Sequence, residues 1–119
     1  MSKLEITFEK RPEAMIISLV GSADMTEANT LKVQLEKILS ENHHIVVIDL
    51  SKLDFITSMG LSTLVYAHRQ CHQQGGILSL AGAQTAVEKV LKTTQLDQLF
   101  DMFGSVEAAI TNAKKEEDT

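Results

Sequence analysis

Four hydroxyl side chains crowd one short stretch of the chain, where a strongly apolar segment gives way to one with helical periodicity. They are Thr57, Ser58, Ser62 and Thr63. Ser58 lies two residues before Gly60, at the expected start of a helix, where free backbone N–H groups and the helix dipole tolerate an anion. A phosphate there would add about −1.5 to −2 charge to the surface without unfolding the domain. A phosphoryl group on Ser58 is therefore compatible with the fold.

The same serine also suits a purely structural part. Serine is a preferred N-cap residue, because its hydroxyl accepts a hydrogen bond from a free backbone N–H of the first helical turn. From the physics of the sequence alone, an N-cap is the more common part for a residue such as Ser58. Thr57, Ser62 and Thr63 are interpreted first as helix-start and solvent-facing residues, and only second as alternative phosphate acceptors.

Two aspartates lie at other junctions between elements. Asp24 follows Gly21 in a Gly-x-x-Asp turn, and Glu27 three residues later gives the spacing of a helix capping box. Asp49 follows the apolar run Ile45–Ile48, where an aspartate can shape a loop by accepting backbone hydrogen bonds. A solvated carboxylate at the end of a strand explains Asp49 equally well.

Metal and enzyme chemistry find little support in the sequence. His68 and His72 are one helical turn apart with Cys71 between them, but no further Cys or His completes a plausible ligand set, so we expect no metal. Ser58 lacks the preceding glycine of a nucleophile elbow, and no glycine-rich phosphate loop is present. Without a catalytic pair or a cofactor loop, the sequence predicts a protein that is not an enzyme and has no cofactor.

The periodicity of apolar residues predicts how these side chains are positioned. Residues 3–9 alternate apolar and polar as in a half-buried strand, and Arg11-Pro12-Glu13 predicts a turn to a second strand. Further along, the pattern predicts a helix after Asp24, a buried strand at 45–48, a connection at 49–57 and a helix up to Gly75-Gly76. A strand at 77–81 and a helix opened by a Thr85/Glu88 capping box follow. The last predicted elements are a short strand at 100–103 and a helix from Ser105 to Ala113. Strands alternating with helices predict a layered α/β domain.

Length and composition bound the class of protein. The 119 residues suit a single domain over 1–119, with an ordered core of about residues 3–113 and a polar tail at 114–119. The net charge of −5 and the absence of Trp argue against a nucleic-acid partner. One cysteine suits a reducing compartment. The lack of a long apolar run and of a signal peptide predicts a cytoplasmic protein without membrane insertion.

The stretch from Val47 to Leu61 resembles the signature of the STAS family. It has an apolar strand ending in Asp49, a short loop with an apolar-aromatic pair, and a small hydroxyl residue before Gly60. The Gly-x-x-Asp turn ending at Asp24 is similar to a second feature of the family, and the order of elements agrees from Leu4 to Ala113. The resemblance implies a single mixed sheet of four to five strands, with about four helices packed mostly on one face.

The resemblance extends to the anti-sigma factor antagonists of that family. It implies that the unphosphorylated protein binds an anti-sigma factor that is itself a serine kinase. That kinase would phosphorylate Ser58 and release the protein, and a phosphatase would reset it. Carried over by position, the residues that would contact the partner are Asp24, Thr57, Ser58, Met59 and Gly60.

An alternative function comes from two departures from the family pattern. Thr57 stands where the family usually has Asp, and Met59 stands where it usually has Ser or Thr. STAS-like domains also serve as scaffolds or accessory subunits of signalling and lipid-transport complexes. The alternative prediction is such a non-enzymatic subunit, which phosphorylation does not switch.

Overall fold

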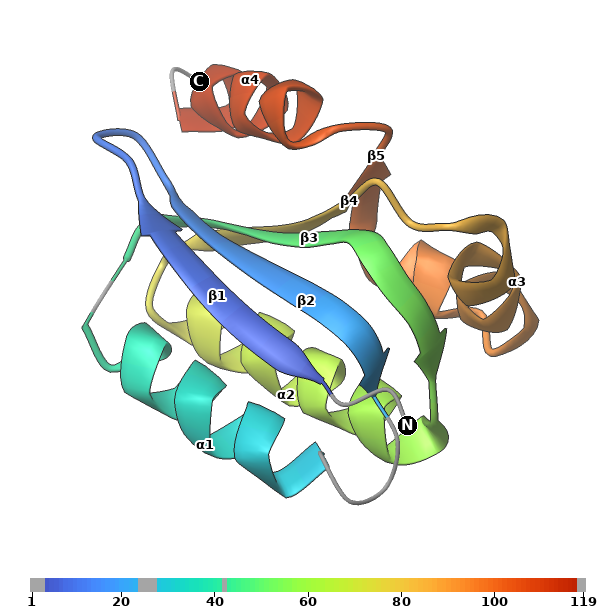
Figure 1. The fold of residues 1–119 in the computed structure, drawn as a ribbon. Helices are drawn as coiled ribbons and strands as arrows, with labels where there is room; N and C mark the ends of the chain where they lie inside the picture. Colours follow the sequence, from blue (N-terminus) through green and yellow to red (C-terminus); the bar gives the residue numbers. More distant parts are fainter. Residues whose placement is uncertain (1–3, 24–27, 42, 118–119) are drawn as a thin grey trace.

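A five-stranded sheet forms the middle layer of the protein, in a computed structural model that describes residues 4–23, 28–41 and 43–117 (Figure 1). The strands lie in the order β1-β2-β3-β4-β5. The first two pair antiparallel as a hairpin, and all the other neighbours pair in parallel. Strand bounds are Glu5–Lys10 (β1), Met15–Ala23 (β2), Ile45–Ile56 (β3), Ile77–Ala81 (β4) and Asp101–Phe103 (β5).

Three helices pack on one face of the sheet and the fourth packs on the other (Figure 1). On the first face, α1, α2 and α3 bury their apolar stripes, and the core includes the fully buried Leu35, Leu64 and Leu91. The predicted mixed α/β architecture with most helices on one face is confirmed. The helices are α1 (Ala28–Leu39), α2 (Ser58–Gln73), α3 (Thr85–Thr93) and α4 (Val106–Glu117), with a 3₁₀ turn η1 at Leu96–Gln98.

The apolar run at the start of β3 is buried from both sides, as its lack of alternation predicts. Val46 and Ile48 belong to the core under α1, α2 and α3. Val47 belongs to a second, smaller core, in which Ala109 and Ala113 of α4 lie against the opposite face of the sheet. Small alanine side chains allow α4 to approach the strands closely.

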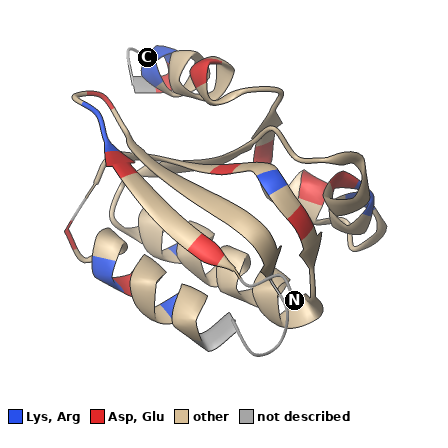
Figure 2. Cartoon of the chain, viewed as in Figure 1, with Lys and Arg blue, Asp and Glu red and all other residues tan. Residues whose placement is uncertain are grey.

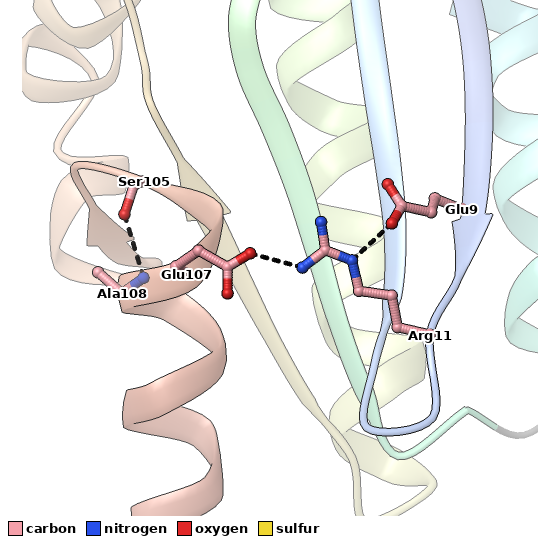
Figure 3. Close-up of polar contacts among 5 residues, drawn as sticks. All are labelled: Glu9, Arg11, Ser105, Glu107 and Ala108. Carbon is pink, nitrogen blue, oxygen red and sulfur yellow. Dashed lines mark hydrogen bonds and ion pairs between the residues drawn. The ribbon is translucent and has the colours of Figure 1, made fainter.

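Polar contacts hold α4 over the hairpin (Figure 3). Ser105 caps the helix as predicted, because its Oγ accepts a hydrogen bond of 3.1 Å from the N–H of Ala108. The guanidinium of Arg11, in the turn between β1 and β2, bridges Glu9 at 2.6 Å and Glu107 of α4 at 2.7 Å. The helix continues to Glu117, beyond the end predicted at residue 113.

Strand β3 is much longer than the sequence predicted, and the expected connection at 49–57 is wrong. The strand runs to Ile56, pairing with β4 only up to Asp49 and with β2 as far as its end. Shifts of register between β2 and β3 break the alternation of two, so the buried residues Leu50, Leu53 and Ile56 come three apart. This long strand carries the chain from the centre of the sheet to the start of α2.

The start of α3 corrects a second prediction, the capping box of Thr85 and Glu88. Thr85 is already the first helical residue, and the N-cap is Gln84, whose side chain makes no capping bond. Instead, the amide of Gln84 donates a hydrogen bond of 2.9 Å to the carbonyl of Ser51, in the part of β3 that β4 no longer pairs. Glu88 forms an ion pair of 3.0 Å with Lys92 one turn later.

Candidate functional site

The candidate site lies where β3 ends and α2 begins. A single residue, Thr57, joins them in an extended conformation with φ −91° and ψ 171°. Its Oγ1 accepts a hydrogen bond of 3.4 Å from the N–H of Gly60, and its carbonyl accepts one of 2.9 Å from Leu61. Thr57 is therefore the N-cap, and the assignment of that part to Ser58 is wrong. The helix begins one residue earlier than predicted, so the hydroxyl that caps it comes from Thr57.

Ser58 is the first residue of α2, and its side chain is exposed. Its hydroxyl makes no hydrogen bond within the part of the chain that the structure describes, so it is open to a group that approaches from outside. Backbone N–H groups of the first helical turn have no partner inside the helix, and the helix dipole is positive at this end. The position accommodates a negative charge without loss of the fold.

Two apolar side chains close to Ser58 in the sequence are more than half exposed. Phe55, near the end of β3, is 52% exposed, and Met59 is 53% exposed. Exposed large apolar groups in the same short stretch as an exposed hydroxyl favour a surface that another protein covers. Charged residues are spread over the molecule, whereas α2 carries very few (Figure 2). Phe55 was not predicted as a residue of the site; its buried neighbours Leu53 and Ile56 are three residues apart, which leaves Phe55 exposed between them.

The other hydroxyls of this stretch differ in their surroundings. Ser62 is exposed on α2, as predicted. Thr63 is buried, and its hydroxyl donates a hydrogen bond of 3.0 Å to the carbonyl of Met59, so its placement on the solvent face is wrong. Threonine in a helix often satisfies its hydroxyl this way. Ser58 and Ser62 are the accessible serines of α2.

The two aspartates singled out in the sequence have different outcomes. Asp24 lies outside the described residues. Asp49 is half-buried within β3 rather than in a loop, at the last position where β3 pairs with β4. Its carboxylate accepts a hydrogen bond of 3.0 Å from the N–H of Ser51. This bond lies where β3 turns away from β4 and extends toward the site.

His68, Cys71 and His72 make up the remaining candidate cluster on α2. The two imidazole rings are stacked with centroids 6.4 Å apart, and His68 meets the ring of Phe100 edge-on at 5.4 Å. Burial lowers the pKa of His68, and the neighbouring His72 lowers it further. Burial raises the pKa of the Cys71 thiol to about 11, so the thiol stays protonated and unreactive at neutral pH.

Across residues 4–23, 28–41 and 43–117, no three His, Cys, Asp or Glu side chains come together in a group that could hold a metal ion. In the same described segments, no helix has the length and apolar character needed to cross a membrane.

Removing the cap should cost more stability than removing the neighbouring serine. We expect Thr57→Ala to lower the free energy of unfolding by about 1 kcal/mol, because it leaves the N–H of Gly60 without its acceptor. Thr57→Ser keeps the hydroxyl and serves as the matched control. Ser58→Ala should change the free energy by less than about 0.5 kcal/mol, as surface substitutions do. Urea unfolding measures all three, and a larger loss for Ser58→Ala would contradict the assignment of the cap.

Comparison with known proteins shows which family has this order of elements. The family model described as the STAS domain matches residues 5–109. The protein BtrV of Bordetella bronchiseptica is 28% identical over 106 residues, which are 89% of this chain and 91% of BtrV.

Solved structures share the fold at lower identity. The crystal structure of an anti-sigma factor antagonist from Mycobacterium paratuberculosis superposes with a TM-score of 0.87 at 22% identity, over 94% of this chain and 95% of that one. The Bacillus protein SpoIIAA in its phosphorylated form gives a TM-score of 0.71 at 18% identity, over 91% of this chain and 98% of that one. These likenesses establish a common fold.

Proposed function

The chain belongs to the STAS domain family, and from this premise we propose that it is an anti-sigma factor antagonist switched by phosphorylation of Ser58. The observation that carries the proposal is the placement of Ser58. Its hydroxyl has no hydrogen bond among the described residues and is exposed at the start of α2, adjacent in sequence to the exposed Met59 and three residues after the exposed Phe55. Similar proteins described as anti-sigma factor antagonists support this general role. We expect the protein to act in the cytoplasm.

In the proposed cycle, the unphosphorylated protein binds an anti-sigma factor that is also a serine kinase. The partner covers Phe55 and Met59 and takes Ser58 out of water. Asp24, Thr57 and Gly60 complete the proposed contact region. Gly60 is buried, so it and Thr57 act there through their hydrogen bond, which shapes the first turn of α2.

Phosphorylation then separates the two proteins. The Oγ of Ser58 forms a bond to the γ-phosphorus of ATP, the bond to ADP breaks, and the hydroxyl proton passes to a base on the kinase. The phosphate is tolerated at the helix start of this protein, but burying its charge in the interface is unfavourable. A phosphatase restores the serine by transferring the phosphoryl group to water.

The first test is where the phosphate goes. Incubating the protein with the anti-sigma factor kinase of the same cell and ATP should add one phosphate, which fragment mass spectrometry should place on Ser58. The reason for this expectation is the exposed hydroxyl, which makes no hydrogen bond to any residue that the structure describes, and Ser58→Ala should take up no phosphate. A phosphate on Thr57 or Ser62 would show that the acceptor is misassigned. If no such kinase modifies the protein, the unswitched accessory subunit becomes the better account.

A further inference from the structure

A groove of about 470 Å³ follows the outer face of α2 and begins at the candidate site. Ser58, Ser62 and Arg69 lie along it on α2, and Leu96 of η1 forms part of the opposite wall. At a rise of 1.5 Å per residue, the eleven steps from Ser58 to Arg69 span about 16 Å, or three helical turns. The groove is thus continuous with the proposed phosphorylation site and long enough for a short helix.

The walls of the groove are mainly apolar. Leu61 is buried at its base, while Val65 and Leu96 pack against the core and keep part of their surface open. The exposed Ser62 lines the same groove on α2, three residues before Val65. A groove with this composition suits apolar side chains spaced three and four residues apart on a partner helix.

The charge of the groove is opposite to that of the protein as a whole. The chain has a net charge of −5, yet Arg69 is the one Lys, Arg, Asp or Glu among the described residues that line the groove. Arg69 is exposed and makes no ion pair or hydrogen bond within the described segments. Tyr66, which also borders the groove, has the ammonium of Lys32 5.1 Å from its ring centre and a hydrogen bond to the carboxylate of Glu36, so these two opposite charges offset each other. The guanidinium of Arg69 is therefore the positive charge that the groove offers to a carboxylate.

We propose that the groove binds an amphipathic helix of the anti-sigma factor kinase, which inserts apolar residues between Val65 and Leu96 and pairs an Asp or Glu with Arg69. This inference rests on the proposed function and adds a second contact region to it. The groove supplies affinity along three turns of α2, while Ser58 at its end supplies the switch. A phosphate on Ser58 then lies where the bound helix would end.

Charge reversal tests the pairing with Arg69. Calorimetric titration with the purified anti-sigma factor kinase should show binding at least about tenfold weaker for Arg69→Glu, since close opposite charges become like charges. Lys115→Glu makes the same change in net charge on α4, across the sheet, and should stay within about twofold of wild type. Reversing acidic residues of the kinase to Lys, one at a time, should identify one variant that restores binding to Arg69→Glu.

Filling the groove tests its occupancy without touching any charge. Ser62→Trp places a bulky ring in the groove from an exposed position, and should weaken binding at least about tenfold while the melting temperature stays near that of wild type. Thr111→Trp, at an exposed position of α4, is the matched control and should bind normally.

The outcomes separate this inference from the function on which it rests. If Ser58→Asp weakens binding but Arg69→Glu and Ser62→Trp do not, the groove is not the docking site and the phosphorylation switch stands. If Arg69→Glu weakens binding and no reversal on the kinase restores it, the proposed ion pair is wrong. If the wild-type protein binds no anti-sigma factor kinase of its cell, the proposed function fails and this inference fails with it.

Discussion

Replacing Ser58 with aspartate should weaken binding of the anti-sigma factor kinase at least about tenfold, or about 1.4 kcal/mol, without lowering the stability of the domain. An aspartate at the first helical residue meets free N–H groups and the positive end of the helix dipole, so the fold tolerates it. The same charge must lose its water when the partner covers Phe55 and Met59, which is unfavourable. A carboxylate carries less charge than a phosphate, so the effect of phosphorylation should be larger.

The matched control for this variant is Thr85→Asp. Thr85 is exposed and is the first residue of α3, as Ser58 is of α2, so the substitution adds the same charge at the same kind of helix position. Calorimetric titration and thermal melting of both variants make the comparison. If Thr85→Asp weakens binding as much as Ser58→Asp, the effect is general charge repulsion, and Ser58 has no special place in the interface.

Replacing Gly76 with alanine should lower the free energy of unfolding by about 2 kcal/mol or more, as overpacking of a core does. Gly76 lies between α2 and β4, and an added Cβ would be 2.8 Å from the carbonyl oxygen of His44 and 2.9 Å from the sulfur of Cys71. Neither can move freely. The His44 carbonyl accepts a hydrogen bond of 2.7 Å from Ile77, and Cys71 is buried in the core.

Gly104→Ala is the control for that substitution, because a Cβ at Gly104, between β5 and α4, would have no atom within 4 Å. It should change the free energy of unfolding by less than about 0.5 kcal/mol in the same urea titration. Gly76→Ala should still bind the kinase normally under conditions where it is folded, since the substitution is at the far end of α2 from Ser58. A stable Gly76→Ala variant would show that the packing around this turn is looser than described.

Much of the fold could be predicted because its strongest signals are local. The continuous apolar run at Ile45–Ile48 indicated a strand buried on both faces, and Ser105 was correctly placed as the cap of the last helix. Glycine at the end of α2 was also a sound signal: Gly75 has φ +79°, a conformation that glycine adopts most easily. These features depend on a few neighbouring residues.

The errors arose where tertiary pairing overrides local pattern. Residues 50–56 look like a loop, because register shifts against β2 space their buried side chains by three instead of two. The helix cap was also predicted one residue too late, at Ser58 instead of Thr57, and Phe55 was not predicted as an exposed residue of the site. The groove containing Arg69 could not be predicted either, because Leu96 meets α2 only after the intervening strand and helix have folded.

The most direct measurement is a calorimetric titration of the anti-sigma factor kinase with two forms of this protein, one unmodified and one carrying a single phosphate on Ser58. The account predicts that the unmodified form binds and that the phosphorylated form binds more than about tenfold more weakly, by at least the margin of Ser58→Asp. Equal affinity of the two forms would contradict the account. It would favour the alternative function, a scaffold or accessory subunit that phosphorylation does not switch.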